Sequence, residues 1–157
     1  MEKREILLKQ LNETVSQLFD AYQNMGNPEI IIYEGWTAKD ILGHIVFWHE
    51  SFARNVRDIV NDTKPTPLKG KYSDLTQRCF DEMSTKTVEE IIMKLEAAHR
   101  VIQENILDPK LVLIPYKKGS RDYTPDEHLD IVNEHIKEHL SDIRKASKDG
   151  CSGLTEN

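Results

Sequence analysis

The chain has 157 residues, a length typical of one domain with its own hydrophobic core. Its 21 Lys and Arg side chains are outnumbered by 27 Asp and Glu side chains, and the net charge of −6 argues against nucleic acid or anionic membranes as partners. No run of about 18 apolar residues is present and the charged N-terminal segment does not resemble a signal peptide, so we expect a cytoplasmic protein. Cys79 and Cys151 stand alone, which indicates neither a disulfide framework nor a zinc ligand set.

Four long segments have the apolar spacing of amphipathic helices, at about 100° per residue. They are residues 2–24, 37–60, 87–107 and 124–147. A shorter helix is expected at residues 73–83. The connector IIIYEG before Trp36 is interpreted as an extended segment without a strand partner, because no second strand-like run accompanies it. The pattern predicts an all-α protein.

Threonine residues mark the starts of three of these helices. Thr37 is followed by Asp40, and Thr87 by Glu90, which are pairs suited to the free N–H groups of a first helical turn. Thr124 precedes a proline, the residue that best suits the first helical position. These signals fix where the helices begin.

Two proline- and glycine-containing loops separate the helices. The first, TKPTPLKGKY, is long enough to cross one end of a helical bundle. The second, DPKLVLIPYKKGSRDY, carries Lys117, Lys118 and Arg121, which can meet an anionic substrate. A solvated basic loop is the commoner meaning of such a run.

The second predicted helix carries two histidines with different placements. His44 falls on the flank of the apolar stripe beside Trp48, whereas His49 falls within the stripe. The two positions differ by about 140° around the helix axis, so they cannot both face one ion. An H-E-x-x-H zinc-protease motif begins at His49, but Ala53 replaces its second histidine. His99, on the apolar face of a later helix, is interpreted as a buried hydrogen-bonded histidine or a substrate contact.

The last predicted helix places His128, His135 and His139 along one flank of its apolar stripe. His135 and His139 are one turn apart, about 6 Å along the axis, so both rings can converge on one metal ion if a third ligand comes from elsewhere. The alternative is a helix margin of hydrogen-bonded histidines. The string HIKEH also matches an H-x-x-E-H metalloprotease motif, but Glu138 projects away from the stripe, which argues against that class.

The strings GWTAKDILGHIVFWHE and HIKEHLSDI resemble the DinB-like four-helix-bundle superfamily over residues 1–146. HIVFWHE and EAAHR are most similar to its ClbS/DfsB branch. The resemblance implies an up-up-down-down bundle, often dimeric, with a long crossover between the second and third long helices. We expect a single domain over residues 1–147 and a disordered tail at residues 148–157, where no apolar period remains.

The same resemblance implies a divalent transition metal, zinc or nickel in several members. One ligand is a histidine of the second helix and two are an H-x-x-x-H pair of the last, which correspond to His44, His135 and His139. Three imidazoles leave coordination positions open, as in catalytic rather than structural sites.

Other candidate site residues surround this set. His128 is the candidate general base, although it can also be an exposed first-turn histidine. Trp48, His49 and His99 are candidate residues of a substrate cavity.

Three functions remain open from the sequence. The first is a metal-dependent enzyme, a thiol transferase or hydrolase, acting on small electrophiles in detoxification or stress response, with a low-molecular-weight thiol as a candidate partner. The second is a non-catalytic dimeric protein that binds or sequesters a ligand. The third is a ClbS-like protection protein that hydrolyses a reactive natural product. His139 is followed by Leu140, Ser141 and Asp142 instead of the His-Arg-Gly-Gln of many thiol transferases in the family, so this motif does not support a thiol substrate.

Overall fold

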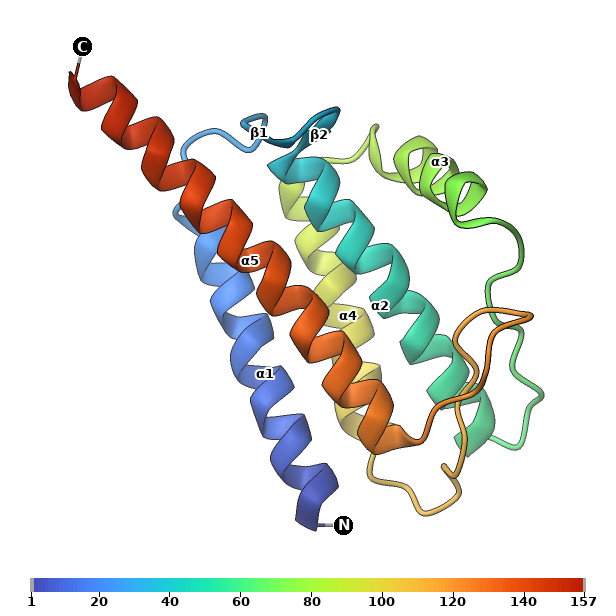
Figure 1. The fold of residues 1–157 in the computed structure, drawn as a ribbon. Helices are drawn as coiled ribbons and strands as arrows, with labels where there is room; N and C mark the ends of the chain where they lie inside the picture. Colours follow the sequence, from blue (N-terminus) through green and yellow to red (C-terminus); the bar gives the residue numbers. More distant parts are fainter. Residues whose placement is uncertain (1, 157) are drawn as a thin grey trace.

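The computed structural model describes residues 2–156, and the side chains of residues 2–147. This part of the chain contains five helices and one short β-hairpin (Figure 1). The elements are α1 Glu2–Gln23, β1 Ile31–Tyr33, β2 Trp36–Thr37, α2 Ala38–Val60, α3 Tyr72–Met83, α4 Val88–Asn105 and α5 Pro125–Glu156. The predicted all-α class is confirmed.

Capping boxes begin three of the four long helices. The side chains of Thr37, Thr87 and Thr124 each accept a hydrogen bond from the backbone N–H three residues later. The acidic side chain at that later position accepts from the threonine N–H in return. Each box satisfies two backbone groups that a helix start otherwise leaves free.

The four long helices lie side by side as two parallel pairs (Figure 1). Arg4, at the start of α1, forms a 3.4 Å ion pair with Asp126 at the start of α5. Lys110, just after α4, donates to the backbone carbonyl of Val60 at the end of α2. Therefore α1 runs parallel to α5, and α2 runs parallel to α4.

The two pairs run in opposite directions. His44 lies against His139, with ring centroids 5.5 Å apart, whereas Phe52 stacks on His128 at 3.9 Å. α2 therefore runs antiparallel to α5. The order of directions along the chain is up, down, down, up, and the predicted order up-up-down-down is wrong.

The β-hairpin explains this difference. β1 pairs antiparallel with β2, with Tyr33 opposite Trp36, and Gly35 in the turn has a positive φ of 80°. The hairpin folds the connector back on itself, so α2 begins near the end of α1 and runs in the opposite direction (Figure 1). The interpretation of IIIYEG as an unpaired segment is also wrong, because its partner strand has two residues and leaves no pattern in the sequence. The long crossover lies between α2 and α4, as predicted, and contains α3.

The hydrophobic core lies between the long helices and is completed on one side by α3. Leu11, Ile41, Ile91 and Leu129 contribute fully buried side chains from four different helices. α3 packs closely on α2 at Gly43.

Beyond residue 147, α5 continues as a helix to Glu156. The side chains there lie outside the described part of the chain, and the predicted disorder of residues 148–157 stays a prediction. Among the described helices, none combines the length and apolarity needed to cross a membrane.

Candidate metal centre

Three histidines from two helices come together in the structure. His44 of α2 meets His135 and His139 of α5, and one ring nitrogen of each lies within 4.8 Å of the others. The Nε2 atoms of His135 and His139 are 3.0 Å apart. Two nitrogens held about 2.1 Å from one ion at a tetrahedral angle are about 3.4 Å apart, so a shift of a few tenths of an ångström brings this pair to the spacing of zinc ligands. The three histidines can hold a metal ion.

The protonation states of these histidines also suit metal binding. Burial, together with the neighbouring His139 and His135, lowers the pKa of His44 to about 4. Burial lowers the pKa of His135 and of His139 as well. All three rings are therefore uncharged at neutral pH, which is the form that coordinates a metal.

The fit of a metal is further supported by an unsatisfied atom. Nδ1 of His44 is buried and has no hydrogen-bond partner among the described residues. Such an atom typically destabilises a fold by about 1–3 kcal/mol. Coordination of a metal by Nδ1 of His44, in a donor set of three imidazoles, would account for this unpartnered atom.

Tyr33 and Asp142 orient His139 from behind. The Tyr33 hydroxyl donates a hydrogen bond to the Asp142 carboxylate, and its oxygen lies 3.2 Å from Nδ1 of His139. The hydroxyl oxygen can then accept the Nδ1 proton of His139, which leaves Nε2 with its lone pair directed towards His135. Burial and the Asp142 carboxylate both raise the pKa of Tyr33, so its hydroxyl keeps its proton.

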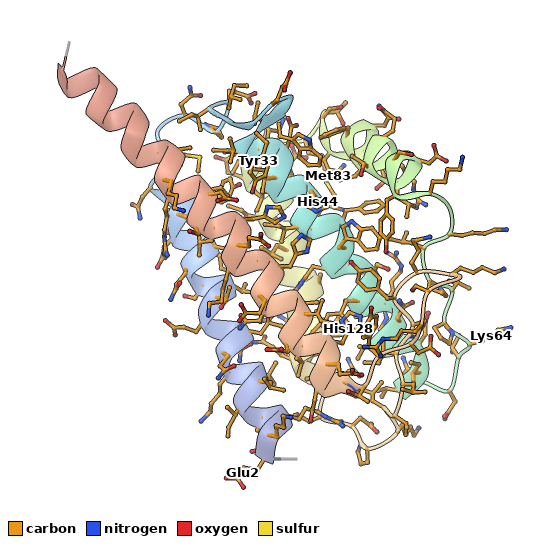
Figure 2. The ribbon with its side chains drawn as sticks, in the orientation of Figure 1. Glu2, Tyr33, His44, Lys64, Met83 and His128 are labelled. Atoms are coloured by element: carbon orange, nitrogen blue, oxygen red, sulfur yellow. The ribbon has the colours of Figure 1, made fainter. Side chains whose placement is uncertain are left out.

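Sequence reasoning missed both of these residues. Asp142 lies one turn after His139, a spacing that a search for partners of the predicted ligands would find. Tyr33 lies in a three-residue strand, and no sequence signal places it near α5. Figure 2 shows Tyr33 and His44 towards the hairpin end of the helices, with His128 near the start of α5, farther from the hairpin.

A small cavity adjoins the histidines between α2 and α5. Its volume is about 30 Å³, which is room for a water molecule but not for an organic substrate. Two of the convergent histidines line it, together with two of the predicted cavity residues: His44, His135, Trp48 and His49. Trp48 stacks on Tyr116 at 5.1 Å, so an aromatic pair forms part of the wall.

His99 does not line this cavity but contacts a residue that does. Nε2 of His49 lies 3.0 Å from Nδ1 of His99, and both side chains are buried. His49 is not part of the convergent set, in agreement with the helix geometry expected from the sequence.

His128, the candidate base, is buried and lines the cavity. It stacks on Phe52, and burial lowers its pKa to about 4. Neither ring nitrogen has a hydrogen-bond partner among the described residues. The alternative of an exposed first-turn histidine is therefore wrong, because the loop carrying Tyr116 covers the ring.

Two of the three loop cations are engaged within the protein. Lys117 donates to the Gly70 carbonyl, and Arg121 forms a 3.0 Å ion pair with Glu127. These contacts hold the loop in place. A role for Lys117 or Arg121 in binding an anionic substrate gains no support from this arrangement.

Comparison with known proteins gives information on the fold only. No protein-family model matches the chain, and no curated protein matches it. A crystal structure of an uncharacterized protein from Clostridium difficile 630 is similar, with a TM-score of 0.72 over 94% of this chain and 97% of that chain. The two sequences are 16% identical, so the similarity extends to the fold and not to an activity.

Proposed function

We propose that the chain is a DinB-like four-helix-bundle protein that binds one zinc or nickel ion and acts on small electrophiles as a thiol transferase or hydrolase. The observation that carries this proposal is the convergence of His44, His135 and His139 beside a cavity. Nitrogen donors of this kind suit zinc and nickel better than magnesium or calcium.

The donor set favours a catalytic over a structural metal. A structural zinc site is closed by four protein ligands, and among the described residues the cluster provides three. A bound ion of this type supplies Lewis acidity and lowers the pKa of a water or thiol that reaches it. The protein's own part is to hold three uncharged imidazoles, with Tyr33 and Asp142 orienting one of them.

A binding or sequestering protein is the second candidate. The small cavity favours it for a ligand no larger than a water molecule or a metal ion, because about 30 Å³ leaves no room for an organic substrate or ligand unless the Trp48 and Tyr116 pair moves. A ClbS-like protein that hydrolyses a reactive natural product would need the same movement of Trp48 and Tyr116 to admit its substrate. The enzyme proposal therefore expects this wall to be the part of the protein that moves.

The experiment begins with elemental analysis of the full chain, purified without a histidine tag. We expect about one zinc or nickel ion per chain at neutral pH. The metal-loaded and metal-free forms are then compared for turnover with low-molecular-weight thiols and reactive acceptors. Bound metal without any difference in turnover would favour the binding-protein candidate. Readily dialysed, substoichiometric metal would contradict a metal-dependent thiol transferase and a metal-dependent hydrolase alike.

A further inference from the structure

A chain of hydrogen bonds leads from the cavity through the core to α1. His49 of α2 contacts His99 of α4 at 3.0 Å, and Nε2 of His99 lies 2.7 Å from Oδ1 of Asn12 on α1. The side-chain amide of Gln103 donates to the same Asn12 oxygen at 3.0 Å. Three helices thus contribute to one line of hydrogen-bonded side chains through the core.

Asn12, at the end of this series of hydrogen bonds, determines which nitrogen of each histidine carries the proton. The Asn12 oxygen can only accept, so Nε2 of His99 carries the proton and donates it. Nδ1 of the uncharged His99 is then an acceptor, and the proton between the rings belongs to Nε2 of His49. The remaining nitrogen of His49, Nδ1, carries a lone pair.

This lone pair has no partner among the described residues. Nδ1 of His49 is buried without a hydrogen bond among the described residues, and the His49 side chain lines the cavity that His44 and His135 also line. His128 lines the same cavity, but no contact fixes which of its nitrogens carries the proton. His49 is therefore the better-oriented base.

A second fixed acceptor lies in the same cavity wall. The Asn55 amide nitrogen donates to the Pro115 carbonyl, which leaves Oδ1 of Asn55 as a buried acceptor with no partner in the part of the chain that the structure describes. Asn55 lines the cavity as well. Since both fixed groups accept, the cavity is suited to a ligand that donates hydrogen bonds and unsuited to a carboxylate or phosphate.

We propose that His49, oriented by His99 and Asn12, is the proton acceptor for a small protic nucleophile in this cavity, either water or a thiol that enters when the Trp48 and Tyr116 pair moves. The proposal rests on the proposed function. It supplies the general base, a group to which the proposed function assigns no residue. The O–H or S–H bond of the nucleophile breaks, its electron pair stays on oxygen or sulfur, and the proton goes to Nδ1 of His49. The positive charge is shared through the His49 Nε2–H bond to His99, whose own N–H bonds to Asn12.

Burial makes His49 a poor site for an isolated charge. It is the main reason why the pKa of His49 in the folded protein is lowered to about 3. The proton transfer does not create an isolated charge, because the anionic nucleophile forms beside the imidazolium in the same step. An ion pair of this kind is attractive in a cavity with little water. His49 therefore stays neutral until a nucleophile is present.

The first test reads the proton positions directly. The full chain is labelled with nitrogen-15 at histidine, and long-range proton–nitrogen NMR spectra are recorded at neutral pH with and without zinc. The signals are assigned with His49→Gln and His99→Gln, and Asn12→Asp marks His99 if a histidine variant does not fold. We expect both residues to carry a proton on Nε2, and both to be neutral in the zinc-free sample. A His49 that carries its proton on Nδ1 alone would overturn the proposal.

The second test reads the proton transfer, with 2-mercaptoethanol as the probe thiol. We expect His49 in the zinc-loaded chain to become protonated at both nitrogens as the thiol saturates. If it is already doubly protonated without thiol, water is the nucleophile. A neutral His49 in both samples, with the proton released to the buffer, would overturn the proposal.

A matched control and a separate outcome complete the design. Glu96→Gln alters an exposed neighbour of His99 in the same surface groove and should leave the NMR signature of His49 unchanged. Failure of the chain to bind zinc removes the proposed function, and the nucleophile with it. A wrong proton position in the zinc-bound chain removes the His49 role alone, so the two failures are distinguishable.

Discussion

The Tyr33 hydroxyl lies 3.2 Å from Nδ1 of His139, while Nε2 of the same ring faces His135 at 3.0 Å. One ring of the candidate metal centre is thus held from a β-hairpin and from α5 at once. The contact fixes which nitrogen is free for a metal, because the hydroxyl proton is already given to Asp142. Metal affinity should therefore depend on a residue that is not itself a ligand.

Replacing Tyr33 with phenylalanine tests this dependence. We expect Tyr33→Phe to weaken zinc binding by about 10- to 100-fold, as loss of a hydrogen bond behind a ligand typically does. The affinity is measured by competition with a chromophoric chelator. Tyr72→Phe is the control, since this tyrosine is exposed and packs beside Lys117 and Trp48 instead of beside His139. Equal zinc affinity of Tyr33→Phe and the wild type would contradict the role given to Tyr33.

Replacement of the histidines by alanine separates ligands from neighbours. We expect His44→Ala, His135→Ala and His139→Ala to lose tight metal binding, because each removes one of three converging donors. His49→Ala should keep the metal, since its ring contacts His99 and not the convergent set. Metal content after dialysis distinguishes the variants.

Circular dichroism shows which of these variants are folded. His49→Ala should lose stability by about 1–3 kcal/mol, because it leaves Nδ1 of buried His99 without a partner. A folded His44→Ala protein that retains its metal while His49→Ala loses it would show that the ligand assignment on α2 is wrong.

The helical part of the site could be predicted because helix geometry is local. The fixed rotation per residue places His135 and His139 on one face and separates His44 from His49, whatever the rest of the fold does. The same rotation located the apolar faces of the helices. The capping threonines were located by another local signal, an acidic residue three positions after each threonine. Contacts within or along one helix therefore need only the sequence.

Contacts between elements depend on directions and offsets that periodicity does not contain. The bond between His49 and His99 requires the relative shift of α2 against α4, and nothing within either helix specifies it. Tyr33 reaches α5 because a two-residue strand turns the connector back, and the same turn reverses the predicted direction of α2. A strand this short is defined by its partner and not by its own pattern.

Buried histidines should make the metal-free protein sensitive to acid. Burial lowers the pKa of His128 to about 4, whereas an unfolded chain has the ordinary value of about 6.5. Between these values the unfolded state binds a proton that the folded state does not. Stability is therefore complete above about pH 6.5 and falls as the pH drops towards 4, by up to about 1.4 kcal/mol per pH unit for each such histidine.

The variant His128→Phe isolates one contribution to this dependence. Phenylalanine can keep the stack on Phe52 and carries no titrating group. We expect the melting temperature in the presence of a chelator to fall less between pH 7 and pH 5 than in the wild type. Part of the fall should remain, because burial also lowers the pKa of His49 and His99. An unchanged fall would show that His128 is solvated in the folded protein.

The contact between α2 and α3 gives a prediction about stability alone. A methyl group at Gly43 would lie 3.0 Å from both Cβ and Cγ of Met83, closer than side-chain atoms pack. Alanine is favoured over glycine in a helix by about 1 kcal/mol, but overpacking a close contact typically destabilises by about 1–3 kcal/mol. The Met83 Cβ is attached to the backbone of α3, so relief requires a shift of that helix. We expect Gly43→Ala to lower the free energy of unfolding in urea by about 1 kcal/mol.

Gly26→Ala is the control, because nothing lies within 4 Å of the added carbon, and it should leave the free energy of unfolding nearly unchanged. Equal values for both variants would contradict the close packing of α3 on α2.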